Sequence, residues 1–527
     1  MQKVNIVNII LHAHLPYVKH IEFPRFLEED WLFESINESY LPLLRMLEKL
    51  SNQAVNYKLT MCFSPTLMTM LTDVDLQQRF LNYMERHLQL GEKEIERTQT
   101  EDTDAHKMAY YYYEKTIKNL EIYKYYKCNI LEGFKELASL GKLELITTAA
   151  THAFLPLYKD YESAIRAQVL VGIQTFENAF GYKPKGFWLP ECGYYPGLEK
   201  ILEEYGVQWC QLPSHSVITA KNKVNTFGYQ PLAIGESNVK AFVRDWSLTN
   251  LIWSNSFGYP CDSDYREFYR DIGYDLPLDY IEPFIHEPKV RVFTGYKYHA
   301  ISGKTENKNF YDLEKAFAKV DLHSDNMLYH IQRKGYMIEP MLNNSPVYNL
   351  CLDAELFGHR WFEGILFLEQ ILRKCEKNDS IYLSTPSLVS QKDFECEAIY
   401  PNTCSWLYGG YADTLLDSSN AWIYKHTTKA ISRMKELAIR FPNQTSLRGR
   451  FLNQAGREVL LAMASDWPYI LHDNTSSDYA QSRIRNHLGS FNLAYTNMCK
   501  NAVNTEWLIN AERRNAIFPT FDYNIFS

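Results

Sequence analysis

Two acidic side chains follow short apolar segments and have surroundings that suit acid–base or nucleophilic chemistry. Glu191 comes after the apolar residues GFWLP, with Trp188 just before it and a Tyr-Tyr-Pro-Gly turn after it. Asp353 ends the apolar run VYNLCLD, and Glu355 follows two positions later. A carboxylate in apolar surroundings is costly unless it is paired or functional. We interpret Glu191 and Asp353 as candidate reactive groups, although Glu191 could cap the next helix and Glu355 fits a buried salt bridge better.

Two histidines with H-x-H spacing lie near the start of the chain. His12 and His14 in LHAHLPY could bind a metal ion, with His152 or Asp353 as a third ligand. Their ring nitrogens could equally bind sugar hydroxyl groups. Because carboxylates and aromatic residues surround these positions, we favour sugar binding over metal binding.

Together these residues are suited to the chemistry of glycosidic bonds. One carboxylate can attack the anomeric carbon, while the other protonates the departing oxygen and then deprotonates the acceptor. The distance between the two carboxylates determines whether configuration is retained or inverted, and a sequence does not give that distance. Both outcomes stay open on these grounds.

Seven short apolar runs have the length and composition of buried strands that position these groups. Amphipathic stretches separate most of them, which predicts parallel strands joined by helices. Polar residues follow nearly every run, as at the carboxyl ends of strands in a β/α barrel, whereas a doubly wound sheet would concentrate them near one point. The predicted strands are 4–11, 59–63, 143–149, 186–189, 208–212, 240–243 and 347–352.

Two further regions have helical patterning. Residues 76–140 are charged and predict a helical insertion between two barrel units. From about residue 420 onward strand patterns disappear. We therefore predict a catalytic barrel over 1–415, including the insertion, and an all-helical domain over 416–527.

Composition narrows the class of protein. The chain has 527 residues and a net charge of -8, which argues against general affinity for nucleic acid or anionic lipid. No apolar run reaches the ~18 residues of a membrane helix. Ten cysteines are scattered without a C-x-x-C pair, as in a reducing compartment. We expect a cytoplasmic protein, a monomer or small homo-oligomer.

Five segments resemble the motifs of glycoside hydrolase family 57, and within it those of the α-glucan branching enzymes. They are HAHLPYV at 12–18, LELITTAATHAFLPL at 143–157, GFWLPECGY at 186–194, DAELFGHRWFEG at 353–364 and CSWLYGGY at 404–411. The resemblance implies a (β/α)7 barrel with a helical insertion and a helical C-terminal domain. It implies a retaining mechanism without metal or cofactor, with Glu191 as nucleophile and Asp353 as general acid/base.

The resemblance also implies which residues bind the substrate, an α-glucan such as amylose, glycogen or a starch-like chain. Combined with the residues that follow the strands, it gives ten candidate substrate-binding positions. They are His12, His14, Trp31, His152, Trp188, Arg244, Trp253, His359, Trp406 and Asp466.

Some positions depart from the branching-enzyme pattern. The fifth motif has Leu407 and Leu415 where a Gly and a second Trp are usual. Ala233 aligns with a Tyr of a mobile loop, and Leu251 and Met463 stand where Gln is common. These groups would hold the acceptor chain, so their loss predicts more hydrolysis relative to transfer.

The leading interpretation is therefore a branching enzyme that cleaves α-1,4 linkages and forms α-1,6 linkages, with raised hydrolysis. An α-amylase or a 4-α-glucanotransferase on the same scaffold is the close alternative. A non-catalytic glucan-binding protein is an alternative of another class, and H-x-H alone suggests a metal-dependent sugar deacetylase or mannosidase.

Overall fold

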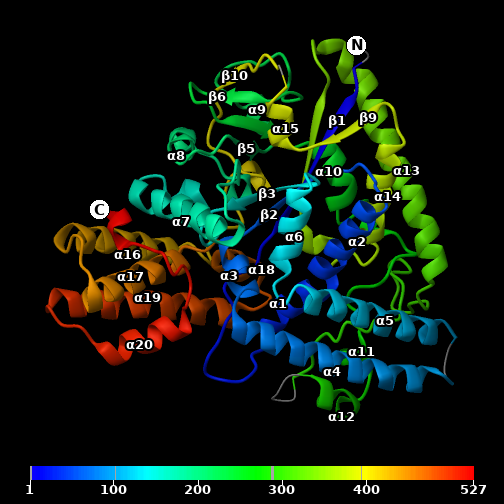
Figure 1. Ribbon diagram of the computed structural model, residues 1–527, viewed down its shortest axis with the longest axis horizontal. Coiled ribbons are helices and arrows are strands. Elements are labelled where there is room, and N and C mark those ends of the chain that lie inside the picture. The colour runs from blue at the N-terminus through cyan, green and yellow to red at the C-terminus, as the bar shows by residue number, and fades with distance from the viewer. Residues whose placement is uncertain (1–2, 101–102, 286–289, 393) are drawn as a thin grey trace.

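Seven parallel strands form a barrel in the computed structural model, which describes residues 3–100, 103–285, 290–392 and 394–527 (Figure 1). Their order around the sheet is β7-β5-β4-β3-β2-β1-β8, and a parallel bridge between Arg244 and Asn349 joins β7 to β8. The predicted (β/α)7 barrel is confirmed. The strands are β1 (Asn5–Ala13), β2 (Leu59–Phe63), β3 (Leu143–Thr148), β4 (Gly186–Trp188), β5 (Trp209–Leu212), β7 (Lys240–Val243) and β8 (Val347–Asp353).

Three further short strands extend this sheet. β6 (Leu232–Ile234) pairs antiparallel with β7, β10 (Ala398–Ile399) pairs with β6, and β9 (Ile381–Ser384) pairs parallel with β1. The sequence did not reveal them, although the barrel strands β4, β5 and β7 are equally short. Residues 231–240 therefore contain a β-hairpin.

Apolar side chains from all seven barrel strands fill the barrel interior. Alternate residues of a strand point to opposite faces, so Ile6 and Ile10 of β1 face inward, while Leu11 faces the surrounding helices. A Cβ atom at Gly186 would lie 2.3 Å from the indole of Trp209, so glycine leaves room for that ring. The interior cluster also contains Cys62, Ile146, Trp188, Phe242, Val347, Cys351 and Val389.

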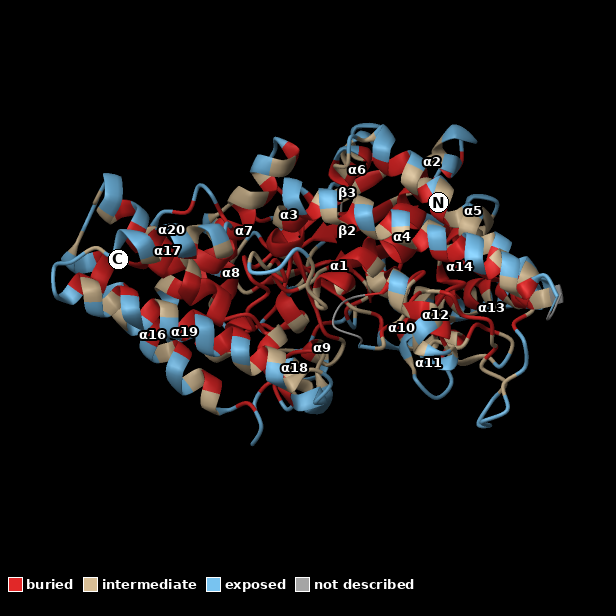
Figure 2. Ribbon diagram, turned by 90° about the horizontal axis from the view of Figure 1, so that it is seen from below, coloured by how far each residue is buried: buried red, intermediate tan, exposed pale blue. Residues whose placement is uncertain are grey.

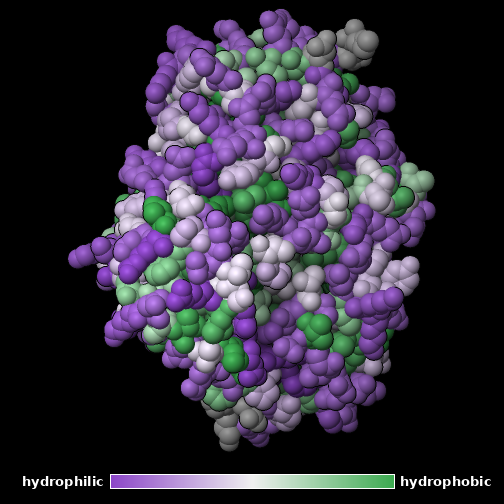
Figure 3. All heavy atoms as spheres, turned by 60° about the vertical axis from the view of Figure 1, so that its left-hand side comes forward, coloured by the Kyte–Doolittle hydropathy of each residue, from purple (hydrophilic) through white to green (hydrophobic). Residues whose placement is uncertain are grey.

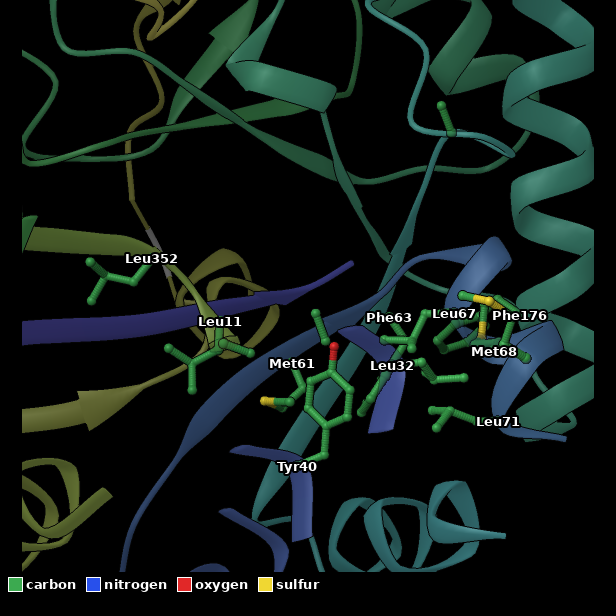
Figure 4. Close-up of a cluster of buried hydrophobic side chains, with 14 of the residues drawn as sticks. Leu11, Leu32, Tyr40, Met61, Phe63, Leu67, Met68, Leu71, Phe176 and Leu352 are labelled. Carbon is green, nitrogen blue, oxygen red and sulfur yellow. The ribbon is translucent and has the colours of Figure 1, made fainter. Parts of the chain in front are cut away.

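The outer faces of the strands pack against helices. Phe63 of β2 lies close to Leu67 of α3 (Pro65–Leu71) and to Phe176 of α7 (Glu162–Phe180), and Met61 lies beside Tyr40 (Figure 4). Burial of each such side chain contributes about 1.5–3 kcal/mol relative to exposure. Figure 2 shows these buried residues continuing from the barrel into the helices around it.

The predicted insertion is helical, and so is an earlier part of the chain. α4 (Val74–Thr98) and α5 (Thr103–Tyr125) pack side by side below the barrel in Figure 1, and α6 (Ile130–Ser139) leads into β3. Earlier in the chain, α1 (Glu29–Ser35), the π-helix η1 (Ile36–Tyr40) and α2 (Leu41–Asn52) follow one another without a break. The predicted domain boundaries remain predictions.

The C-terminal residues form a helical bundle that contacts the barrel. Its helices are α16 (Trp422–Arg440), α17 (Ser446–Ala462), α18 (Asp466–Asp473), α19 (Ser477–Cys499) and α20 (Thr505–Arg514). Ala464 forms an antiparallel bridge with Ala153 after β3, and Thr151 Oγ1 donates to the carbonyl oxygen of Leu460 at 2.6 Å. The junction before α18 is thereby fixed beside the carboxyl end of β3.

The face in Figure 3 is largely hydrophilic, with small hydrophobic areas between polar side chains. Within the described parts of the chain, no helix combines the length and apolar character needed to cross a membrane.

Candidate active site

A cavity of about 420 Å³ contains most of the predicted site residues. It lies where the barrel strands end, so residues distant in sequence meet there, as is usual for barrel enzymes. The predicted residues in its lining are His12, His14, His152, Glu191, Arg244, Trp253, Asp353, Trp406 and Asp466.

Strand pairing brings His12 and Asp353 together. β1 and β8 are parallel neighbours, and their register places His12 opposite Asp353. Alternation along β1 gives His12 the inward direction of Ile6 and Ile10. As a result, His12 Nδ1 lies 3.7 Å from Asp353 Oδ1 at the top of the barrel interior.

Glu191 sits in a strained turn directly after β4. Its φ is 55° and that of Cys192 is 50°, a left-handed conformation that costs a non-glycine residue roughly 1–3 kcal/mol. The strand-like segment at 404–406 holds this turn: Tyr194 and Cys404 exchange two backbone hydrogen bonds, and Trp406 N–H donates to the Glu191 carbonyl at 3.0 Å. The Trp406 indole Nε1 also donates to Glu191 Oε2 at 2.6 Å. Trp406 therefore fixes both the backbone and the carboxylate of Glu191.

The environment makes Glu191 hard to ionise. Burial raises its pKa to about 7, the hydrogen bond from Trp406 opposes the shift, and the charge of Asp353 adds to it. Two carboxylates in one cavity repel each other when both are charged. The raised pKa favours the neutral form of Glu191, whereas attack on an anomeric carbon requires its ionised form, which the hydrogen bond from Trp406 supports.

Glu355 is held by neutral donors. Its Oε1 accepts from the Tyr40 hydroxyl and from the backbone N–H of His14, at 3.1 Å for the latter. Burial and, to a lesser extent, the charge of Asp353 raise the pKa of Glu355 to about 7. The expected salt bridge is replaced, within the described residues, by these two hydrogen bonds.

Three histidine rings and an indole stack along one wall of the cavity. His12 lies parallel to Trp188, with ring centroids 4.6 Å apart, and His14 stacks on His152 at 4.2 Å. His12 Nε2, His14 Nδ1 and His152 Nε2 are buried and have no hydrogen-bond partner among the described residues. Buried polar atoms require partners, so these nitrogens are suited to ligand hydroxyl groups.

The C-terminal helices contribute to this wall. His14 Nε2 lies 3.1 Å from Asp466 Oδ1. Burial disfavours the charge on His14, but Asp466 outweighs it and raises the His14 pKa. Burial lowers the pKa of His152 well below its usual value, and His14 adds to this effect. The Ser465 hydroxyl donates to the His152 carbonyl and lies 2.9 Å from His152 Nδ1, which leaves Nε2 as the free acceptor of a neutral ring.

Within the described residues, no group of three or more His, Cys, Asp or Glu side chains is arranged to hold a metal ion. Stacked rings direct their nitrogens side by side, whereas metal ligands converge on one point.

Three predicted residues lie outside the cavity lining. Trp188 is behind His12, Trp31 packs edge-on against Tyr479 with centroids 5.6 Å apart, and His359 Nδ1 lies 2.7 Å from Glu38 Oε2. The roles of Trp31 and His359 in substrate binding stay predictions.

Other lining residues were not predicted. Tyr408 is 84% exposed and Tyr469 is 48% exposed, and both rings border the cavity. Tyr469 lies about one helical turn after Asp466. This spacing alone would have predicted from the sequence that Tyr469 lies near the site. Tyr40 lies in η1, where no local motif indicates that its hydroxyl reaches Glu355.

One position that departs from the branching-enzyme pattern lies in the cavity lining, and the others lie close in sequence to lining residues or within the sheet. Leu407 lines it, whereas Leu415 is buried against Phe154 and Ala412. Ala233 pairs with Lys240 and Ala398 within the sheet, and Met463 is buried beneath the site. The alignment of Ala233 with a mobile loop over the cleft is therefore not supported.

Known protein families and a characterised relative match this chain in sequence. The profile of "Glycosyl hydrolase family 57" matches residues 8–335, and that of "1,4-alpha-glucan branching enzyme, C-terminal" matches residues 426–526. The chain is 31% identical over 522 residues to the 1,4-alpha-glucan branching enzyme TK1436 of Thermococcus kodakarensis, covering 92% of this chain and 72% of that protein.

Solved structures agree closely over the whole length. The alpha-amylase AmyC from Thermotoga maritima is 38% identical with a TM-score of 0.94, covering 100% of this chain and 99% of that one. The GH57-type branching enzyme from Pyrococcus horikoshii is 29% identical with a TM-score of 0.88, covering 99% and 96%. Because the family profile spans more than half of the chain, this protein belongs to glycosyl hydrolase family 57 and is an enzyme.

Proposed function

We propose that the protein cleaves α-1,4-glucan chains by double displacement and transfers the released segment to the 6-hydroxyl of an acceptor chain, with part of it hydrolysed. The observation that carries this is the shared cavity of Glu191 and Asp353, next to three buried histidine nitrogens that have no partner among the described residues. Hydrogen-bonding nitrogens beside carboxylates suit a neutral, hydroxyl-rich substrate.

The proposed steps follow from the contacts. Glu191, oriented by Trp406, attacks the anomeric carbon while Asp353 gives its proton to the departing glycosidic oxygen. Asp353 then takes a proton from the acceptor hydroxyl or from water, whose oxygen bonds to the anomeric carbon and displaces the Glu191 carboxylate from the glycosyl ester. The free nitrogens at His12 and His152 bind sugar hydroxyls during both steps.

Transfer is supported by the match of residues 426–526 to the branching-enzyme C-terminal profile and by the 31% identical branching enzyme. Hydrolysis as the main outcome is the second candidate, supported by the 38% identity to an alpha-amylase over the whole chain. Leu407 is the departure that reaches the cavity, and it replaces a glycine of the branching pattern with a bulky apolar side chain.

The test is incubation of the protein with amylose, with α-1,6 linkages and reducing ends counted by proton NMR. The Glu191→Gln variant is the inactive comparison, and Glu236→Gln, at an exposed carboxylate, is the control. New α-1,6 signals that disappear in Glu191→Gln alone support branching. Reducing ends without α-1,6 signals support the amylase alternative, and no reaction in the wild type contradicts both.

A further inference from the structure

A second cavity, of about 1000 Å³, shares no lining residue with the candidate active site. It lies among α2, α5 and α6 on one side and α13 (Leu313–Ile338) and α14 (Gly364–Glu376) on the other, at the lower right of Figure 1. None of the proposed catalytic steps uses it.

Five aromatic residues line this second cavity. Tyr125, at its rim, is 74% exposed, and its ring lies 4.9 Å from that of Tyr126 in an edge-on arrangement. Phe317 of α13 is 36% exposed. Tyr111 is half-buried and Phe362 is buried, so Tyr125 and Phe317 supply the exposed ring faces. Exposed flat rings are costly in water, and they offer apolar faces on which the faces of sugar rings can stack.

The charged groups of this cavity favour a neutral ligand. Its lining contains four basic and six acidic side chains, so neither sign dominates. Lys49 pairs with Glu369 and Lys118 with Glu114, at 2.8 Å and 3.3 Å. Mixed donors and acceptors beside aromatic faces match a chain of hydroxyl groups better than they match a phosphate or a carboxylate.

Two cationic side chains remain as hydrogen-bond donors. Within the described chain, neither Arg45 nor Lys115 has an ion pair, although Arg45 donates to Asn119 Oδ1 at 2.8 Å. Lys115 Nζ lies 5.1 Å from the centroid of the Phe362 ring. Burial lowers the pKa of Lys115 to about 8, so the amine is held in a partly desolvated position where a ligand hydroxyl can accept from it.

We propose that this cavity is a second glucan-binding site, which holds a segment of an α-glucan chain away from the point of bond cleavage. The proposal rests on the proposed α-glucan activity. The same elements build both sites: α2 begins directly after Tyr40, which donates to Glu355, and Phe362 closes the segment that starts at Asp353. A chain bound here is thus anchored to the framework of the catalytic carboxylates.

The test counts glucan sites by calorimetric titration with maltoheptaose, in a Glu191→Gln background that prevents cleavage. The site variant carries Tyr125→Ala and Phe317→Ala, and the matched control carries Tyr336→Ala, an 80% exposed tyrosine of α13 outside the cavity. Each ring contributes about 0.5–1.5 kcal/mol, a factor of about 2 to 13, so the double variant weakens the second site about fivefold or more.

We expect two binding sites in the background and control proteins. In the double variant one site should keep its affinity, and the second should be weaker by about fivefold or more. Equal stoichiometry and affinity in all three overturn the inference, as does a double variant that loses affinity for glucose 1-phosphate but not for maltoheptaose. Circular dichroism of each variant verifies folding. Cleavage of amylose by the wild type is scored separately, so a protein that binds in the cavity but cleaves nothing refutes only the proposed function.

Discussion

The hydrogen bond from Trp406 to Glu191 can be removed while the aromatic ring is kept. In Trp406→Phe the indole Nε1, which lies 2.6 Å from Glu191 Oε2, is lost. The Arg244 guanidinium lies 4.9 Å from the centroid of the Trp406 ring, and phenylalanine keeps an aromatic side chain at that position. The substitution therefore tests the donor separately from the ring.

The expected size of the effect follows from the charge that the bond supports. A hydrogen bond to a charged group is worth about 1.5–3 kcal/mol, and 1.36 kcal/mol corresponds to one pKa unit. Loss of the donor should raise the pKa of Glu191 by about 1–2 units above its value of about 7. Because Glu191 must be ionised to attack, activity falls on the acid side of this pKa, and the variant at pH 6 should be about 10- to 100-fold slower.

The assay is the pH dependence of kcat/KM on a chromogenic maltooligosaccharide. The acid limb of the profile should move to higher pH in Trp406→Phe. Trp253→Phe changes another tryptophan of the same cavity and is the control, because Trp253 makes no hydrogen bond to Glu191 in the described structure. An acid limb that stays in place in Trp406→Phe would refute the assignment of the indole as the support of the Glu191 charge.

Three further results are expected. Asp466→Asn should lower the pKa of His14, because only the charges of Glu355 and Glu191 then oppose the effect of burial; histidine NMR titration measures this, and an unchanged pKa contradicts it. Gly186→Ala should destabilise the fold by about 1–3 kcal/mol, because the new Cβ meets Trp209, whereas Gly489→Ala in α19, with open space around it, should be neutral or stabilising in the same thermal melts. Prolonged dialysis against EDTA should leave amylose cleavage unchanged, and lost activity that zinc restores would revive the metal alternative.

The sequence predicted the seven barrel strands because each is a short apolar run between amphipathic stretches. It predicted the carboxylates for a related reason: parallel strands end at the same side of a barrel, so residues after them meet. Asp353 and His12 came together through the register of β8 and β1 in this way. Local pattern and topology were sufficient there.

Side-chain direction was harder to predict than position in the chain. His359 follows the Asp353 segment closely but lies against Glu38 instead of in the cavity. Leu415 was expected near an acceptor chain and is buried against Phe154. Tyr40 was missed because its contact with Glu355 joins segments 315 residues apart, and long-range packing of this kind leaves no local signal.

In the proposed mechanism Glu191 becomes covalently linked to the glucan while Asp353 moves the proton. The direct measurement is peptide mass mapping after Asp353→Asn protein reacts with a maltosyl fluoride, whose leaving group needs no acid. We predict a single maltosyl ester on Glu191. An adduct on another carboxylate, or turnover to product of inverted configuration without any adduct, would contradict the account.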